Sequence, residues 1–351
     1  MAWLAGYMYL HGDSDATALR DRCMGDVGPR SVFWMALHCS DSGDLSQALA
    51  MLEQCLASFE ESGDRWGIAA VLAARAKHAH VRADLEALRS DSAESARLFR
   101  ALGDRWGQLQ ALGWLGSHAE LVGDFRGAVK LHTEALRMAE ELGLWPDVAG
   151  EYGWLGWTAV REGDYAQATA YGEQAFQLAM EQGNRPMESL GALVLGFAAR
   201  RSGEFDVAEK RLQSLIDEAR RQDDAVLYLS MVLDELGFLM EQQGELEAAR
   251  ALHEEAYELG VGQESPRAMA WSLEGIAGTV AVSAPAVAAR LLGAAVVVRE
   301  VEGLPVTAAE GADVLRIEQA ARAVLGEQYD AEYAAGRLLT LEEAYALVSG
   351  V

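Results

Sequence analysis

The sequence predicts an all-α fold: a right-handed superhelical solenoid of paired helices with a period of about 40 residues and a C-terminal helical cap. Three observations predict it. One turn recurs along the chain at a constant spacing, and a second turn lies about 20 residues after each recurrence. The segments between the turns have no alternating, β-branched runs with hairpin signals, so strands are not expected. Two turns in each period mean two helices in each period.

The recurring turn joins a small residue to an acidic one. Its copies are Gly43-Asp44, Ala83-Asp84, Gly123-Asp124, Gly163-Asp164, Gly203-Glu204 and Gly244-Glu245. The second turn occurs at Gly63-Asp64, Gly103-Asp104, Gly143, Gly183-Asn184, Asp223-Asp224 and Glu264. Glycine adopts the left-handed conformation that ends a helix, and the following Asp or Asn accepts N–H bonds from the next first turn. We therefore expect a helix of about 16 to 18 residues between successive turns.

Small residues inside each period have a second fixed spacing. Leu115-Gly116 precedes Ala128 and Ala135, with twelve residues from the Gly to the first Ala and seven more to the second; the pattern recurs after Gly156 and Gly237. This spacing resembles that of the tetratricopeptide repeat (TPR), whose period is about 34 residues. The resemblance implies that the first helix of each pair, helix A, lines a concave surface.

The repeat rhythm divides the chain into two parts. We expect residues 1–283 to form a TPR-like array of about seven units, the first one truncated, because a turn at Gly12-Asp13 lies only 31 residues before Gly43. Met1 stands directly before an apolar helix without an N-cap, so we expect the chain to begin inside a longer protein. Residues 284–351 lose the rhythm and should form a capping segment with helices at 288–299, 308–325 and 341–347, the last with a capping box of Thr340 and Glu343.

A family resemblance rests on the capping segment. Its residues are Ala288-Ala289-Arg290-Leu291-Leu292-Gly293-Ala294-Ala295, Gly303-Leu304-Pro305, Ala335-Gly336-Arg337 and Leu341-Glu342-Glu343-Ala344. They resemble the C-terminal stretch of the TPR sensor arrays in AfsR-like and large ATP-binding LuxR-type transcriptional regulators of high-GC bacteria. Only 3 of the 29 basic residues are Lys, which fits a GC-rich genome. The resemblance implies a sensor array whose ATPase and DNA-binding domains lie elsewhere.

The amino-acid composition limits the kinds of partner that the chain is expected to bind. Asp and Glu outnumber Lys and Arg by 54 to 29, and the formal charge of −25 would repel nucleic-acid phosphates and anionic membranes. Direct nucleic-acid or membrane binding is therefore not expected. The three cysteines, Cys23, Cys39 and Cys55, fit neither a disulfide framework nor a zinc knuckle, and no signal peptide or membrane span is visible. The sequence is typical of a cytoplasmic bacterial protein.

Catalytic, cofactor and metal sites are not expected. None of Lys77, Lys130 and Lys210 follows a Gly, so there is no Walker loop for nucleotide. His38, His78 and His118 recur at one repeat position, but helices pack roughly 8–10 Å apart, which is too far for three such side chains to share one ion. The recurring histidines are better explained by packing between repeats.

Groove-facing positions of helix A provide the candidate site. Matching the TPR pattern places Ser117, Trp157, Phe197 and Phe238 on one inner row, Glu120, Arg200 and Glu241 on a second row, and Arg161 and Arg201 beside them. Aromatic and Arg side chains in a concavity are typical of binding hot spots, and Arg favours a carboxylate-bearing ligand. We therefore expect Trp157→Ala or Arg201→Glu to weaken partner binding while leaving the melting temperature nearly unchanged.

The function favoured by these residues is a non-catalytic interaction and sensor domain. Its groove would bind a protein segment or peptide, which can also belong to other domains of the same regulator. Two alternatives stay open: a receptor for a small molecule or signal peptide enclosed in the groove, and a scaffold that associates with itself through the C-terminal helices.

Overall fold

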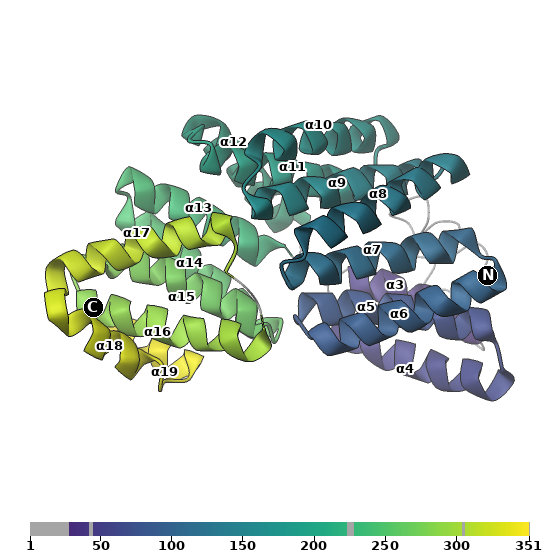
Figure 1. The fold of residues 1–351 in the computed structure, drawn as a ribbon, viewed down its shortest axis with the longest axis horizontal. Coiled ribbons are helices and arrows are strands. Elements are labelled where there is room, and N and C mark those ends of the chain that lie inside the picture. Colours follow the sequence, from purple (N-terminus) through teal and green to yellow (C-terminus); the bar gives the residue numbers. More distant parts are fainter. Residues whose placement is uncertain (1–27, 42–44, 223–227, 304–305, 351) are drawn as a thin grey trace.

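The computed structural model describes residues 28–41, 45–222, 228–303 and 306–350, and all regular elements within these ranges are helical. Figure 1 shows them as consecutive antiparallel pairs followed by short C-terminal helices. The elements are α3 (Pro29–Asp41), α4 (Leu45–Ser62), α5 (Arg65–Val81), α6 (Leu85–Leu102), α7 (Arg105–Leu121), α8 (Phe125–Leu142), α9 (Trp145–Glu162), α10 (Tyr165–Gln182), α11 (Arg185–Arg201), α12 (Phe205–Gln222), α13 (Leu229–Gln243), α14 (Leu246–Gly262), α15 (Pro266–Val280), α16 (Pro285–Glu302), α17 (Ala308–Leu325), η1 (Gly326–Gln328), α18 (Tyr329–Gly336), α19 (Leu341–Ala346) and η2 (Leu347–Gly350). The predicted fold class, a TPR-like helical solenoid, is confirmed.

The predicted turns end and restart helices in the expected way. Gly123 has φ 82°, and Ala83 and Glu264 adopt the same left-handed conformation without being glycine, with φ 55° and 50°. Asp104 caps α7 by accepting the Gly107 N–H at 3.1 Å. The predicted turns at Gly12-Asp13, Gly43-Asp44 and Asp223-Asp224 lie outside the described residues.

Small residues bring the two helices of a pair close together, as the TPR spacing predicts. A Cβ on Gly116 in α7 would lie 2.5 Å from Nε2 of His132 in α8. Gly237 in α13 faces His253 in α14 at 2.6 Å in the same way. The glycine is therefore required where a buried histidine ring of the second helix occupies the space of a side chain.

The C-terminal segment contains the three predicted helices and one that the sequence analysis missed. α16 packs on α15 as the second helix of a further pair, so the expected boundary at 283/284 falls between two paired helices. Thr340 and Glu343 form the predicted capping box of α19. The missed helix, α18, packs on α16, and α17 packs against α16 and against α9 (Figure 1).

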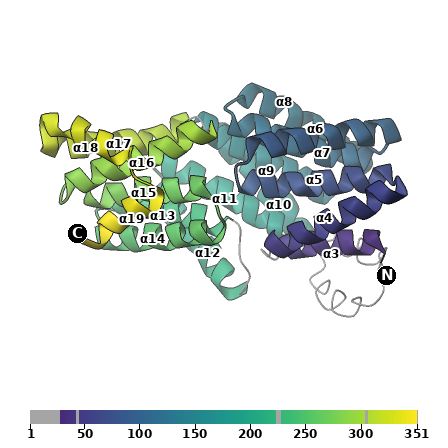
Figure 2. The ribbon, with the colours of Figure 1, turned by 90° about the horizontal axis from the view of Figure 1, so that it is seen from below.

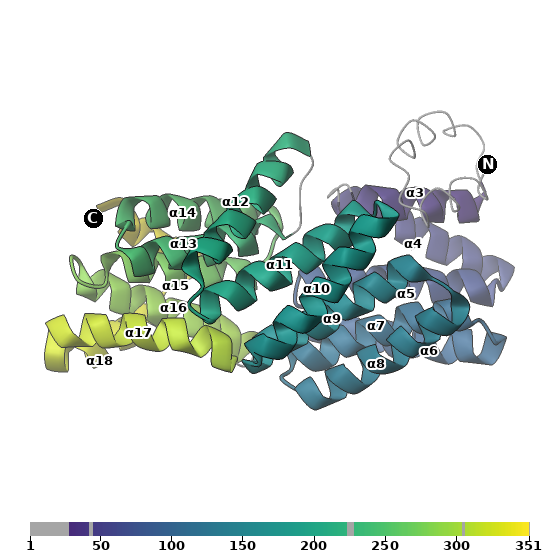
Figure 3. The same cartoon turned by 90° about the horizontal axis from the view of Figure 1, so that it is seen from above.

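The array curls until its late repeats meet its early ones. Figure 2 and Figure 3 show α13–α19 lying beside α3–α10, with α11 and α12 between the two groups. Two contacts mark the junction: Arg82 at the end of α5 pairs with Glu264 before α15 at 3.2 Å, and the rings of Phe197 in α11 and Trp271 in α15 lie 6.3 Å apart. In the part of the chain that the structure describes, every helix is too short or too polar to cross a membrane.

Candidate functional site

The candidate site lies where helix A of several repeats converges on the inner side of the curl. α7, α9, α11, α13 and α15 bury charged or polar side chains there as well as apolar ones. α15 is buried at every residue from Met269 to Val280, because neighbouring helices cover it on all sides. Charged groups that enter this region must find partners inside the protein, since an unpaired buried charge is very costly.

Two clusters of ion pairs supply these partners. The Glu310 cluster contains Glu120, Arg161, Arg267, Glu274, Arg299 and Glu310. The Asp313 cluster contains Arg200, Arg201, Glu235, Glu241, Asp313 and Arg316. Each has three arginines and three carboxylates, so each is formally neutral although the whole chain carries −25. α17 joins the clusters, because it supplies Glu310 to one and Asp313 to the other.

Hydrogen bonds satisfy most polar atoms of the Asp313 cluster; the exceptions among the described residues are Nη1 of Arg201 and Oε2 of Glu241. Arg200 in α11 donates to both carboxylate oxygens of Asp313 at 2.7 and 3.1 Å and to Glu235 in α13 at 2.7 Å. Arg201 donates to both oxygens of Glu235 at 3.0 Å. Burial alone would raise the pKa of Asp313, but the Arg200 guanidinium outweighs it and lowers that pKa to about 2. This carboxylate is therefore ionised at neutral pH.

The Glu310 cluster is less completely satisfied. Arg299 donates to Glu310 at 2.8 Å, whereas Arg267 and Arg161 approach Glu310 only to 3.8 and 3.9 Å, beyond hydrogen-bond distance. Nη1 of Arg161 and Oε1 of Glu120 form an ion pair at 2.5 Å that lacks hydrogen-bond geometry. Among the described residues, Nε of Arg161, Nη2 of Arg267 and Oε2 of Glu120 are also buried without a hydrogen-bond partner. Burial, together with repulsion by Arg161, lowers the pKa of Arg267 to about 10. Nη2 of Arg267 thus has no carboxylate of the described residues within hydrogen-bond distance.

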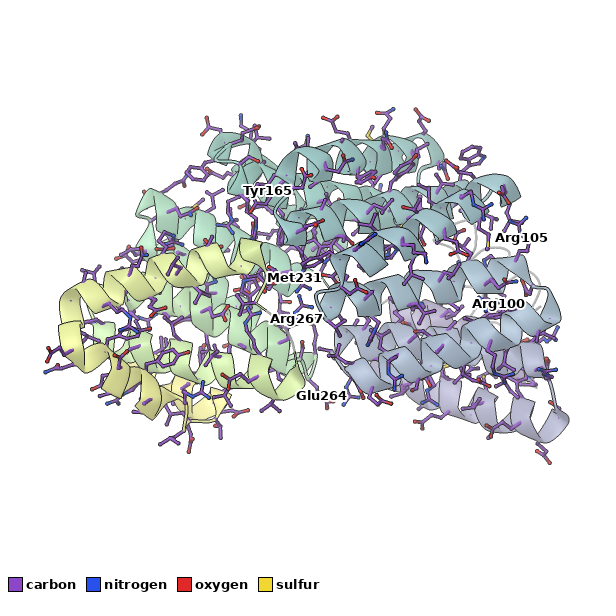
Figure 4. The ribbon with its side chains drawn as sticks, in the orientation of Figure 1. Arg100, Arg105, Tyr165, Met231, Glu264 and Arg267 are labelled. Carbon is purple, nitrogen blue, oxygen red and sulfur yellow. The ribbon has the colours of Figure 1, made fainter. Side chains whose placement is uncertain are left out.

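Aromatic rings lie next to the Glu310 cluster. His80 in α5 stands 5.8 Å from the ring of Trp114 in α7 and 5.5 Å from that of Trp154 in α9, and all three side chains are partly buried. Burial and the nearby guanidiniums of Arg267 and Arg161 lower the pKa of His80 to about 3, so the ring is neutral at pH 7. Figure 4 shows Arg267 and Met231 at the centre of the molecule, between its two halves. The arrangement combines flat apolar surfaces with two guanidinium groups.

The structure corrects the expected inner row of Ser117, Trp157, Phe197 and Phe238. All four are buried, with at most 6% of any residue exposed. Trp157 packs against Phe197 at 5.2 Å and Phe238 packs against His253 at 4.8 Å. The expectation that these side chains stand open in the groove is wrong for this conformation, because the tight curl closes the inner surface over them. Trp157→Ala or Arg201→Glu therefore cannot separate binding from folding, since both residues are packing or ion-pair partners.

The structure also shows where the charged candidates lie. Glu120 and Arg161 form one ion pair, Arg200 and Arg201 share Glu235, and Glu241 pairs with Arg316 of α17. The expected basic group is present, but carboxylates of the same chain already contact its arginines. Sequence reasoning missed the other members: Glu235, Arg267, Glu274, Arg299, Glu310, Asp313 and Arg316. The available signal was a lone charge inside an apolar helix, as with Glu274 and Arg299.

A partly buried carboxylate outside both clusters is expected to make the stability depend on pH. Asp147 in α9 accepts a hydrogen bond from Gln110 at 2.7 Å, and burial, with the nearby Glu151 charge, raises its pKa to about 6. A folded-state pKa above the unfolded value means that stability is greatest below about pH 4 and is lost as the pH rises through 6. We expect Asp147→Asn to raise the free energy of unfolding by up to about 3 kcal/mol at pH 8 and to change it little at pH 4.

Thermal unfolding at both pH values measures this effect. Asp217→Asn is the matched control, because Asp217 also accepts an amide hydrogen bond, from Gln213 at 2.8 Å, but does so on the exposed surface of α12. A stabilisation by Asp147→Asn that is the same at pH 4 and pH 8 would show that the charge of Asp147 is not its cause.

Comparison with known proteins identifies the fold but no family. No protein-family model and no curated protein matches the sequence. Among solved structures, the chain is similar to a Rap protein complexed with competence and sporulation factor, with a TM-score of 0.52 and 15% identity over 75% of this chain and 78% of that one. It is also similar to NprR in complex with its cognate peptide NprX, with a TM-score of 0.53 and 14% identity over 87% and 97% of the two chains. At these identities the likeness shows the TPR-like solenoid fold.

Proposed function

We propose that this chain is a non-catalytic sensor domain that binds a peptide or an extended protein segment on the inner side of its helical array. The binding region comprises the Glu310 cluster and the neighbouring rings of His80, Trp114 and Trp154. The sensor belongs to a cytoplasmic transcriptional regulator of the AfsR-like or LuxR type, and the segment comes from a separate molecule or from another domain of that regulator.

One observation carries the proposal: polar atoms of several repeats converge in the Glu310 cluster without hydrogen-bond partners. The atoms belong to Glu120 in α7, Arg161 in α9 and Arg267 in α15, which are helix A of three units. Arg161 and Glu120 contact each other as an ion pair, but without the geometry of a hydrogen bond. A buried polar atom left without a partner costs about 1–3 kcal/mol, and such groups in native proteins call for an explanation. A ligand that supplies the missing acceptors and donors is that explanation.

The fold and the composition support a peptide as the ligand. The NprR structure that resembles this chain holds a peptide. The inner side offers arginines for a carboxylate and flat rings for apolar side chains, a combination that suits a short peptide with an acidic or C-terminal carboxylate group. The charge of −25 disfavours nucleic acid as the direct partner.

Selection of random peptides against the chain tests the proposal. We expect binding peptides to be recovered and to lose at least about tenfold in affinity when Arg267→Gln removes a guanidinium from the inner side, because truncating a hot-spot anchor costs about 2 kcal/mol or more. Fluorescence anisotropy with the recovered peptides measures the loss. Arg126→Gln is the matched control: it makes the same change on the exposed surface of α8, an outer helix.

Failure to recover any peptide, or equal loss of affinity in both variants, would contradict the proposal. Hydrogen exchange with a recovered peptide bound distinguishes a peptide that spans several repeats from a small ligand enclosed in one place. A peptide that spans the array protects helix A of several units. Protection confined to α7, α9 and α15 would favour a small enclosed ligand, which the compact group of His80, Trp114, Trp154 and the two arginines also suits.

A further inference from the structure

Helix α17 lies on the surface that the sequence analysis assigned to a ligand. It begins at Ala308, with Thr307 as its N-cap, and runs along the inner side of the α13–α16 repeats, with its first turns reaching α9 (Figure 3). Its preceding partner in the chain, α16, belongs to the outer layer of the last pair. α17 thus follows the last pair and connects it to α9 of an earlier repeat.

The face that α17 buries is half charged. Its most buried side chains are Glu310, Asp313, Ile317 and Ala321, of which two are carboxylates one helical turn apart. Glu310 faces Arg299, Arg267 and Arg161, and Asp313 faces Arg200. The arginines come from α9, α11, α15 and α16, so two carboxylates of one helix face cations from four others.

The carboxylates of α17 do not supply hydrogen-bond partners to all of the arginine N–H groups that face them. Glu310 accepts a hydrogen bond from Arg299, while Nε of Arg161 and Nη2 of Arg267, which approach Glu310 only to 3.9 and 3.8 Å, have no hydrogen-bond acceptor among the described residues. Buried ion pairs contribute little net stability, because the cost of removing both charges from water offsets their attraction. On the opposite face of α17, Leu315 and Val324 are each more than half exposed to solvent. The helix therefore leaves apolar side chains in water as well as burying others. The ion pairs of α17 therefore contribute little to holding it in place, and its apolar contacts rest mainly on Ile317 and Ala321.

We propose that α17 is an internal occupant of the binding surface, and that an acidic helical segment with two carboxylates one turn apart binds the same arginines by displacing it. This inference rests on the proposed function and specifies the chemistry of the partner. The arriving carboxylates take the places of Glu310 and Asp313, and the four receiving helices keep their ion pairs. Displacement of α17 then changes the exposed surface of the C-terminal segment and makes ligand binding visible to an adjoining domain.

A synthetic peptide with the sequence of residues 306–325 tests this exchange without knowledge of the natural partner. We expect Glu310→Gln/Asp313→Asn in the full chain to weaken the hold on its own α17 and to raise the affinity for the labelled peptide at least tenfold. Amide exchange in α17 should accelerate at least tenfold in the same variant. The matched control is Glu327→Gln/Asp330→Asn, which removes two negative charges from exposed positions of the same segment.

A reversible disulfide that fixes α17 against α15 provides a second experiment. A Cβ on Gly278 in α15 would lie 3.3 Å from Cγ1 of Ile317, so cysteines at these two positions are within reach of a disulfide. We expect Gly278→Cys/Ile317→Cys to bind the peptide when reduced and to lose at least tenfold in affinity when oxidised. Equal binding by the oxidised and reduced forms, or equal affinity of the two charge variants, would overturn the exchange.

The two proposals can fail separately. If peptides from the random selection bind the locked and the reduced chain alike, the binding function stands and α17 is not its competitor. If the 306–325 peptide exchanges as expected but the selection yields no peptide, α17 is a displaceable helix and the peptide-sensing function is wrong. A 306–325 peptide with Gln and Asn in place of its two carboxylates must fail to bind, because otherwise the arginines do not recognise it.

Discussion

Replacing Arg299 by Met is expected to lower the free energy of unfolding by about 3–5 kcal/mol. Arg299 in α16 donates two hydrogen bonds to Glu274 in α15, both at 2.9 Å, and both residues are at most 5% exposed. Met keeps much of the apolar volume but leaves the Glu274 carboxylate buried without its cation. Glu274 lies in the middle of a fully buried helix, so it cannot reach water without opening the last repeat.

Three measurements separate loss of charge from loss of packing. Arg89→Met, which breaks an exposed pair with Glu86, should cost less than about 0.5 kcal/mol in urea unfolding. Arg299→Met/Glu274→Met also removes the Glu274 charge and leaves only Glu310 without Arg299, so it should recover part of the loss. Burial raises the pKa of Glu274, and loss of Arg299 raises it further, so the destabilisation should be smaller at pH 5 than at pH 8. A double variant less stable than Arg299→Met would refute the ion-pair explanation.

Replacing Gly336 by Val is expected to detach α18 from α16, at a cost of about 3 kcal/mol or more. A Cβ on Gly336 would lie 2.1 Å from the carbonyl oxygen of Arg290 and 2.5 Å from its Cα. On the other helix, a Cβ on Gly293 would lie 2.2 Å from the carbonyl oxygen of Tyr333. These neighbours are backbone atoms that cannot turn aside, so the two helices must separate.

Hydrogen exchange measures the detachment through the amides of residues 329–336, which should lose their protection, and Tyr329, now buried, should become accessible. Gly311→Ala in α17 is the control, because its nearest contact is a methyl carbon of Val306 at 3.4 Å. There Ala should stabilise the helix by about 0.5–1 kcal/mol. Retained protection of residues 329–336 in Gly336→Val would mean that the helix crossing can adjust.

The helices could be predicted where local chemistry decides them. Ala83 and Glu264 end helices although neither is glycine, and the 40-residue period still located both turns. α19 was predicted from Thr340 and Glu343, which satisfy each other's backbone groups within one turn. α18 was missed because no side-chain hydrogen bond caps its start, and because packing on α16 at Gly293 and Gly336 specifies its position. A helix that depends on a distant contact leaves little trace in its own residues.

For the inner surface, too, the sequence determined one property and only the tertiary structure decided another. The repeat pattern by itself determined which residues belong to helix A, and hence that Trp157, Phe197, Arg161 and Arg200 face inwards. Only the tertiary structure decided whether those side chains are open to a partner. Curvature accumulates over successive repeats, and a small rotation in each one brings α15 and α17 against α9 and α11. Whether a given arginine is free or already paired depends on this accumulated geometry, which no single repeat encodes.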